Sequence, residues 1–153
     1  MKIEDMYRQP GHLIRRAHQR SSAIFMEETR SLGITPVQFC ALIVIREHSG
    51  IDATRVSELI AFDRATIGNV LARLEVKGLI VRRAGVEDKR TKLLFLTPKG
   101  QAIIRKLDAA AGRISERLLA PLSPSDRTLL LKLLAQLSDE PGTRSAIELA
   151  NLA

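Results

Sequence analysis

The chain has 153 residues, of which 45% are hydrophobic and only 3% aromatic, and its formal charge of +7 corresponds to a pI near 10.2. This length suffices for one domain, with or without appended helices, that buries a real core. A single cysteine excludes an internal disulfide, and no apolar run approaches the roughly 20 residues needed to span a bilayer. With no signal-peptide pattern, a cytoplasmic protein with a polyanionic partner is expected.

Residues 1–52 predict an N-terminal region with two helices. The pair Thr35-Pro36 is typical of a helix start, and glycine-containing pairs punctuate the rest of the region. The second helix is apolar almost all round, so we expect it to be buried at the centre of the fold. In chain order we expect a loose arm, a long helix and the buried helix over residues 1–9, 12–32 and 37–48.

Residues 53–100 carry a pattern that predicts a winged helix-turn-helix unit. Two short amphipathic helices are separated by a turn, and two β-prone runs joined by a charged loop follow them. The pair Thr97-Pro98 then predicts the start of another helix. The two helices and the two strands are expected over residues 53–60, 64–77, 79–83 and 91–96.

The second helix of this unit has the features of a recognition helix. Asp63 is a residue type whose carboxylate caps a helix N-terminus, and Gly78 supplies a left-handed stop. Apolar residues recur at spacings of three and four on one face of the helix. The opposite face carries side chains that form hydrogen bonds, namely Arg64, Thr66, Asn69 and Arg73.

Basic residues concentrate in the same unit. Residues 54–100 contain ten Lys or Arg against five Asp or Glu, so most of the net positive charge of the chain lies there. Because a basic face next to a helix-turn-helix is the electrostatic footprint of nucleic-acid binding, double-stranded DNA is the expected polyanion.

Residues 101–153 predict C-terminal helices that join two chains. Three helices are expected, over residues 98–119, 124–137 and 145–152. Their content of Leu, Ile and Ala exceeds what a lone pair of helices can hide from water. A second chain is therefore expected to cover them, with Leu107, Leu130 and Leu134 in the contact. The alternative is that these helices fold back over the first two.

Four segments resemble the multiple-antibiotic-resistance regulator (MarR) family in their order and spacing. They are Asp63-Arg64-Ala65-Thr66, Val70 to Ile80 with its Arg-Leu-Glu-x-Lys-Gly-Leu core, Asp88-Lys89-Arg90, and Leu96-Thr97-Pro98-Lys99-Gly100. The resemblance covers almost the whole chain. It implies a mainly α-helical fold with a small β-wing, a homodimer joined through its N- and C-terminal helices, and repression relieved by a small ligand. Residues 10–18 are similar to members that control degradation of aromatic or N-heteroaromatic acids.

Eleven residues are predicted to contact DNA. Arg64 and Asn69 are expected to read bases, because small neighbours let this helix lie in a groove roughly 12 Å wide. Arg73 and Lys77 are expected to meet phosphate, and an ordinary solvated face is the alternative. The predicted set is Thr54, Ser57, Arg64, Thr66, Asn69, Arg73, Lys77, Arg83, Asp88, Lys89 and Arg90.

In the wing, the resemblance implies a joint role for Asp88 and Arg90. The aspartate would orient the arginine into the minor groove, so that this long side chain loses less rotamer freedom on binding. The alternative is a solvated hairpin tip.

An effector site is predicted where the first long helix, the central helix and the DNA-binding lobe meet. His12, Arg15 and His18 follow one another at a spacing of three, each turned by roughly 60° from the last. Two imidazoles and a guanidinium in this arc could clamp a carboxylate. The further predicted members are Arg16 as a second donor and Phe39, Cys40 and Ile43 as an apolar wall. A solvated basic face or a salt bridge between helices explains the trio equally well.

Enzyme chemistry finds little support in the sequence. His-x-x-x-His, Cys-x-x-Cys, Gly-x-Ser-x-Gly and phosphate-loop patterns are absent, so we expect neither an enzyme nor a bound cofactor or metal. A metal site from His12, His18 and His48 stays open, although no carboxylate neighbours the first two at ligand spacing. Cys40, in an apolar run, is more often a small core residue, and a redox sensor would need it exposed with a lowered pKa.

These patterns predict a homodimeric transcriptional regulator, most simply a repressor. It would bind a pseudo-palindromic operator in double-stranded DNA, have no membrane partner, and be released by a small aromatic or N-heteroaromatic carboxylate. Two alternatives remain. A redox-sensing repressor acting through Cys40 would be released by peroxide, and a nonspecific basic DNA-binding protein would be lost to excess random competitor DNA.

Overall fold

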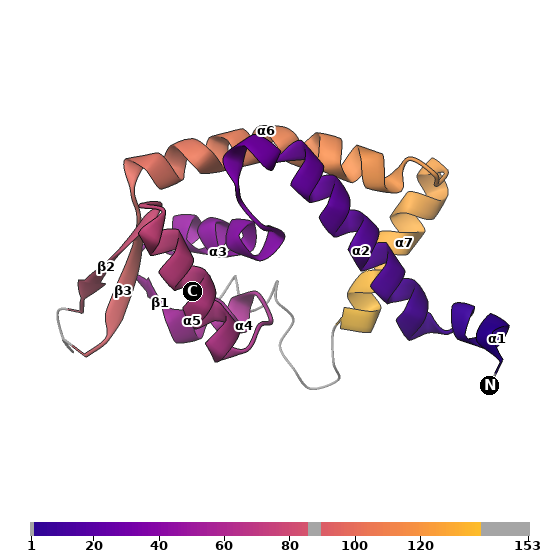
Figure 1. The fold of residues 1–153 in the computed structure, drawn as a ribbon, viewed down its shortest axis with the longest axis horizontal. Helices are drawn as coiled ribbons and strands as arrows, with labels where there is room; N and C mark the ends of the chain where they lie inside the picture. The colour runs from indigo at the N-terminus through magenta and orange to yellow at the C-terminus, as the bar shows by residue number, and fades with distance from the viewer. Residues whose placement is uncertain (1, 86–89, 139–153) are drawn as a thin grey trace.

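The computed structural model describes residues 2–85 and 90–138, which form a mainly helical fold with a small antiparallel sheet (Figure 1). The N-terminal elements are α1 Ile3–Tyr7, α2 Pro10–Glu28, η1 Arg30–Leu32 and α3 Pro36–Glu47. The middle elements are β1 Ile51–Asp52, α4 Ala53–Leu59, α5 Arg64–Val76, β2 Ile80–Ala84 and β3 Lys92–Leu96. The C-terminal elements are α6 Pro98–Leu119 and α7 Pro124–Ser138. The helix expected over residues 145–152 lies outside the described residues.

One long helix, α6, connects the two ends of the molecule. Figure 1 shows α3, α4, α5 and the sheet gathered beneath the first half of α6 as one lobe. From α6, α2 slopes away toward α1, so its first turns, α1 and α7 lie at the other end. Where α2 meets α6, Glu28 accepts from Arg113 Nε at 3.0 Å and from Arg117 at 2.8 Å. These ion pairs attach α2 to the second half of α6.

A continuous hydrophobic core fills the lobe. Its largest fully buried side chains include Leu42, Ile67, Leu71 and Leu94. Burying such a side chain stabilises the fold by roughly 1.5–3 kcal/mol relative to exposure. Leu107 is 1% exposed within the chain and belongs to this core. Its predicted place in the dimer contact is therefore wrong, because the stripe of α6 that carries it packs on the lobe.

Side-chain caps confirm the expected helix starts. Each capping residue accepts a hydrogen bond from the backbone amide three residues later, over 2.8 to 3.3 Å, and the set is Thr35, Asp63, Thr97 and Ser123. Such caps satisfy amides that have no partner within the helix. At the other end of α5, Gly78 adopts a φ of 68°, the expected left-handed stop.

The two wing strands pair antiparallel in the expected place, and a third strand joins them. Val81 lies opposite Phe95, and Ile51 of β1 lies opposite Leu94, which gives the strand order β1-β3-β2. Strand β1 was not predicted from the sequence, since a strand of two residues is too short to show an alternating pattern. This strand ties the loop between α3 and α4 to the wing.

The start of α6 is fixed against the end of the recognition helix. A Cβ at Gly100 would lie 2.1 Å from the carbonyl oxygen of Leu79, so only glycine permits this approach. The Thr97 hydroxyl donates to the carbonyl of Gly78 at 2.7 Å. The long helix is therefore held at the junction between α5 and the wing.

The expectation of a loose arm over residues 1–9 is wrong. Residues 3–7 form helix α1, in which the Asp5 carboxylate accepts from the backbone amide of Lys2 at 2.9 Å. Two carboxylates in the first turn also complement the positive end of the helix dipole. A short charged helix of this kind leaves no apolar period for sequence reasoning to detect.

The first long helix and the central helix also differ from expectation. Helix α2 begins at Pro10 and ends at Glu28, and residues 30–32 follow as the 3₁₀ helix η1. Between them, the buried Thr29 donates its hydroxyl to the carbonyl of Phe25 at 2.8 Å. The central helix α3 is buried on one face only, through Gln38, Ala41, Leu42 and Ile45. The side of α3 that carries Cys40 is exposed within the chain.

Candidate nucleic-acid interface

Helices α4 and α5 form the helix-turn-helix, and backbone hydrogen bonds fix the turn between them. Asp52 caps α4 by accepting from the amide of Arg55 at 3.0 Å. In the turn, the amide of Phe62 donates to the carbonyl of Ser57 at 3.1 Å, and Ala61 adopts a left-handed φ of 54°. This conformation costs an alanine more than a glycine, so the turn is held by its neighbours.

Asp63 holds the first turn of the recognition helix α5. Its Oδ1 accepts from the amide of Thr66 at 2.8 Å, and its Oδ2 accepts from the Thr66 hydroxyl at 2.5 Å. These hydrogen bonds, the hydroxyl bond first, hold the pKa of the Asp63 carboxyl below its ordinary value. Because the Thr66 proton is used in the cap, only the acceptor side of that hydroxyl remains for DNA.

The outer face of α5 presents the side chains predicted to read bases. Arg64, Asn69 and Arg73 are exposed, and no residue that the structure describes forms an ion pair with either arginine. The inner face is buried through Ile67, Val70, Leu71 and Leu74. Because the core fixes the inner face, the outer face is a rigid surface that a groove can accept.

Lys77 has protein partners where a phosphate contact was predicted. Its ammonium group donates to the carbonyl of Gly33 and, at 3.2 Å, to Oε1 of Gln38, a residue only 3% exposed. The structure therefore gives Lys77 a structural role, in which it ties the end of α5 to the start of α3.

The two phosphate contacts predicted on α4, Thr54 and Ser57, differ in how accessible their side chains are. Ser57 is 5% exposed, and its hydroxyl donates to the carbonyl of Thr54 at 2.6 Å, so it has little access to a phosphate. Thr54 is half-buried at the start of the helix. Of the pair, only Thr54 keeps a side chain at the surface.

The wing presents its arginines in three different settings. Arg82 forms an ion pair with Glu75 of α5 at 3.1 Å, which braces the wing against the recognition helix. The guanidinium carbon of Arg83 lies 5.0 Å from the centre of the Phe95 ring, within cation–π range. Arg90 is exposed at the return of the hairpin. The predicted residues Asp88 and Lys89 lie outside the described residues.

The predicted effector residues do not converge within one chain. Nη2 of Arg15 lies 3.4 Å from Nδ1 of His12. Both residues are in the first turns of α2, the part of the helix that slopes away from the lobe, hereafter the arm (Figure 1). The contact between α2 and α3 is made by Phe25, whose ring centre is 5.8 Å from that of Phe39. At about 1.5 Å per residue, His12 lies roughly 20 Å along the helix from Phe25. Arg15, Arg16 and His18 are exposed, and Ile43 is partly buried on α3.

His12 of α2 and Cys40 of α3 bear on the metal and redox alternatives. Within residues 2–85 and 90–138 no group of three His, Cys, Asp or Glu side chains is placed to hold a metal, while His12 Nε2 is buried without a described partner. Cys40 is exposed, as a redox sensor requires, yet desolvation raises the pKa of its thiol above the ordinary value. A raised pKa leaves less thiolate at neutral pH, which disfavours oxidation.

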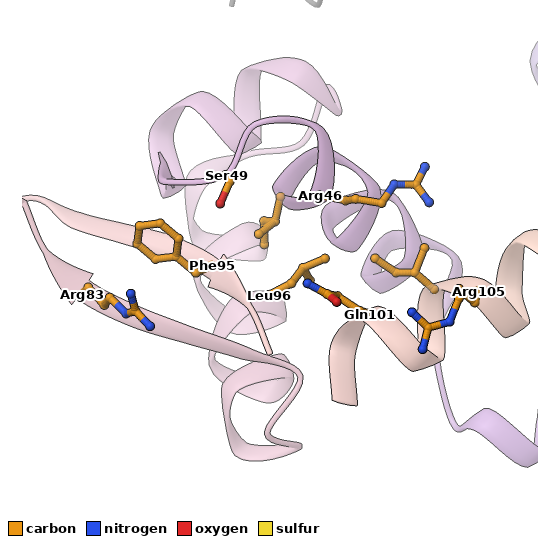
Figure 2. Close-up of a pocket in the computed structure, with 9 residues that line it drawn as sticks. Arg46, Ser49, Arg83, Phe95, Leu96, Gln101 and Arg105 are labelled. Carbon is orange, nitrogen blue, oxygen red and sulfur yellow. The ribbon is translucent and has the colours of Figure 1, made fainter. Parts of the chain in front are cut away.

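A pocket that no sequence pattern predicted lies where the wing joins the lobe. This wing-root pocket has a volume of about 370 Å³ (Figure 2). It is lined from α3, the loop after it, the two wing strands and α6 by Ile45, Arg46, Ser49, Arg83, Phe95, Leu96, Gln101, Ile104 and Arg105. These residues are spread over 61 positions of the chain, and no local motif marks them.

The terminal helices expose apolar side chains at the end opposite the lobe. No residue of α7 is buried, and its exposed leucines are Leu129, Leu131, Leu133, Leu134 and Leu137. Ile3, Leu13 and Ile14 of α1 and α2 are likewise at least half exposed. Among the described residues no helix combines the length and apolarity needed to cross a bilayer. Several exposed apolar side chains on neighbouring terminal elements are typical of an interaction site.

Comparison with known proteins gives a consistent set of relatives. The chain is 31% identical to the HTH-type transcriptional repressor NicR of Pseudomonas putida over 135 residues, covering 88% of this chain and 85% of NicR. Among solved structures, Bordetella bronchiseptica BpsR, described for regulation of its DNA binding by 6-hydroxynicotinic acid, has a TM-score of 0.82 with 32% identity, covering 88% of this chain and 96% of BpsR.

A second solved structure shows a relative on DNA. The transcriptional repressor CouR, bound to a 23-mer DNA duplex, has a TM-score of 0.82 and 28% identity, and the match covers 91% of this chain and 99% of CouR. Residues 32–91, which include the helix-turn-helix and the first wing strand β2, match the sequence profile of the MarR family. Fold, profile and relatives agree, and the chain belongs to the MarR family of winged helix-turn-helix transcriptional regulators.

Proposed function

We propose that this protein is a dimeric, sequence-specific DNA-binding repressor that a small aromatic or N-heteroaromatic carboxylate releases from its operator. It is a regulator and not an enzyme. The observation that carries the proposal is the exposed outer face of α5, where Arg64, Asn69 and Arg73 stand on a helix fixed by its Asp63 cap and its buried inner face. The repressor relatives NicR and CouR support the same reading.

Each side chain of the outer face has a separate role in this proposal. Asn69 can form paired hydrogen bonds with adenine, and Arg64 with guanine, in the major groove. Arg73 lies further along the helix and meets phosphate, while Arg83 and Arg90 bring the wing to the backbone and the minor groove.

Dimerisation supplies the second half of operator recognition. The exposed leucines of α7 and the exposed apolar residues of α1 and α2 belong to elements that lie at the end away from the lobe (Figure 1). A second copy that covers them buries this surface and sets two lobes on two half-sites about one helical turn of DNA apart. The operator is therefore pseudo-palindromic.

Ligand release requires a ligand that prefers one lobe spacing. A carboxylate with equal affinity for both conformations of the dimer would shift nothing. The relative BpsR, whose DNA binding is regulated by 6-hydroxynicotinic acid, supports this ligand class. For the predicted residues His12, Arg15, Arg16, His18, Phe39, Cys40 and Ile43 to form one site, the arm of one chain would have to reach the α3 of its partner.

A fragment library of genomic DNA selected on the protein, followed by gel-shift titration, tests the proposal. We expect a recovered palindromic site to stay bound in excess random DNA, and Asn69→Ala to weaken it by about 1–3 kcal/mol. Addition of 6-hydroxynicotinate or a related acid should release it. Loss of binding to random competitor would instead favour a nonspecific DNA-binding protein.

The redox alternative has its own control. Peroxide should leave operator binding of the wild type and of Cys40→Ser equally intact, since the raised pKa of the Cys40 thiol leaves it mostly protonated. If peroxide instead released the wild type but not Cys40→Ser from the operator, regulation by thiol oxidation would be supported in place of regulation by a carboxylate.

A further inference from the structure

The wing-root pocket is electropositive. Three arginines and no carboxylate line it. Arg46 is neutralised, because its guanidinium contacts Asp108 and Glu47 at 2.8 Å each. Arg105 forms no ion pair with any residue that the structure describes, and Arg83 rests on the ring of Phe95. Two guanidinium groups thus keep their charge available to an anion.

The α6 side of the pocket offers hydrogen-bond donors of the right kind. Gln101 and Arg105 are four residues apart on α6, so their side chains are neighbours on the helix surface. Figure 2 shows both on the same side of the pocket, whereas the end of Arg46 points away from it. A guanidinium can bind a carboxylate through two parallel hydrogen bonds, and the amide of Gln101 adds a further donor.

The floor between the two arginines is apolar. Ile45, Leu96 and Ile104 line it, and Phe95 closes the end nearest the wing. The Phe95 ring packs against Gly50, where an added Cβ would lie 3.4 Å from its Cζ. A volume of about 370 Å³ is at the lower end of small-molecule sites, which suits a ligand of one ring.

We propose that the wing-root pocket binds a small aromatic carboxylate, with the carboxylate on Arg105 and Gln101 and the ring against Leu96 and Phe95. The walls of the pocket come from the lobe, the wing and the long helix, so the ligand contacts all three. Because the guanidinium of Arg83 lies over the Phe95 ring, a ligand that contacts Phe95 also changes the position of Arg83, which is a predicted DNA contact. This regulatory half of the inference rests on the proposed function, and the binding half does not.

Benzoate is the probe, and benzamide, of the same shape without the charge, is the matched control ligand. The chain contains four phenylalanines, so ring resonances of phenylalanine-labelled full-length protein can be assigned with Phe95→Leu. We expect benzoate to move the Phe95 resonances in a saturable titration and benzamide to leave them in place. Absence of a Phe95 response to benzoate would overturn the inference.

Two variants of exposed residues test the assignment of donors. Arg105→Gln should weaken benzoate binding about tenfold or more, the loss expected for charge-assisted hydrogen bonds, and Gln101→Trp should abolish it by filling the pocket. Lys106→Gln removes the same charge from the next, exposed position outside the pocket and should bind benzoate as wild type does. Equal losses in Arg105→Gln and Lys106→Gln would overturn the site, because a general charge effect would then explain them.

Operator titrations with the same variants separate the two proposals. Release by benzoate that Arg105→Gln removes supports both the pocket and its regulatory effect. Benzoate binding at Phe95 without operator release supports the pocket and contradicts its role in release. An aromatic carboxylate could still release Arg105→Gln from the operator and no longer release Arg15→Ala. That result would contradict the regulatory effect of the pocket and leave the proposed function standing.

Discussion

The ammonium group of Lys77 donates to Oε1 of Gln38 at 3.2 Å, so the end of the recognition helix holds the first turn of α3. The same ammonium reaches the carbonyl of Gly33, and Lys99 Nζ donates to the carbonyl of Lys77 at 2.8 Å. Connections from three parts of the chain therefore meet at one residue. We therefore expect Lys77 to help to orient α5 relative to the rest of the lobe.

Lys77→Met should lower the free energy of unfolding by about 1 kcal/mol, the usual net value of a hydrogen bond, as measured by urea denaturation. Operator affinity should fall because α5 is less well oriented, while its dependence on salt concentration stays the same. Arg73→Met is the comparison, since loss of a phosphate contact reduces the salt slope by about 1. An equal reduction of the slope in Lys77→Met would restore the phosphate role predicted from the sequence.

The wing should lose affinity on removal of either member of the pair Asp88 and Arg90. Arg90→Ala should weaken operator binding by about 1–3 kcal/mol, because a groove-inserted guanidinium loses both hydrogen bonds and charge. Asp88→Ala should weaken binding too, although it removes a negative charge next to DNA. Gel-shift titration measures both, and tighter binding of Asp88→Ala would contradict its orienting role.

The dimer should depend on the outer leucines of α7. Leu134 and Leu137 are 41% and 73% exposed within the chain, so a glutamate at each position costs the lobe little and charges the proposed contact. The double variant Leu134→Glu/Leu137→Glu should be monomeric by light scattering and weak on the operator. Lys132→Glu, an exposed polar position on the same helix, should remain dimeric. A dimeric leucine variant would place the interface elsewhere.

Acid should weaken the attachment of α2 to α6. Arg117 first, and then Arg113, hold the pKa of the Glu28 carboxyl below its ordinary value by hydrogen bonding to the ionised form. A lowered folded-state pKa gives stability that is fully present above the ordinary carboxyl pKa and is lost as pH falls through the lowered value. Thermal unfolding of the wild type should therefore approach that of Glu28→Gln as pH falls from about 6 to about 3. Glu4→Gln, at an exposed carboxylate of α1, should not change the profile.

Local patterns predicted most of the secondary structure. Thr97 and Asp63 cap their helices as expected, and Gly78 ends α5, since caps and stops act over three or four residues. The short elements escaped prediction for the same reason. Strand β1 has two residues and α1 has five, so neither is long enough to establish a hydrophobic period.

The outer face of α5 could likewise be read from spacing, because the buried and exposed faces of a helix follow from its period. The partners of individual side chains could not. The side chain of Ser57 turned inward to its own helix, and that of Lys77 found Gly33, 44 residues away. All four residues, Ser57, Lys77, Arg64 and Arg73, are polar types found at DNA interfaces. Residue type alone therefore does not predict that the first two bind within the protein and the last two stay exposed.

The sequence by itself determined a basic winged helix-turn-helix with apolar terminal helices, because helix caps, strand alternation and the composition of each segment are local properties. The tertiary structure alone decided what lies next to what. In the folded chain the arm with His12 and Arg15 lies away from α3, and Arg83 and Arg105 both line the wing-root pocket. Such neighbours are set by the packing of α6 across the lobe, and packing depends on shapes that meet only after the chain has folded.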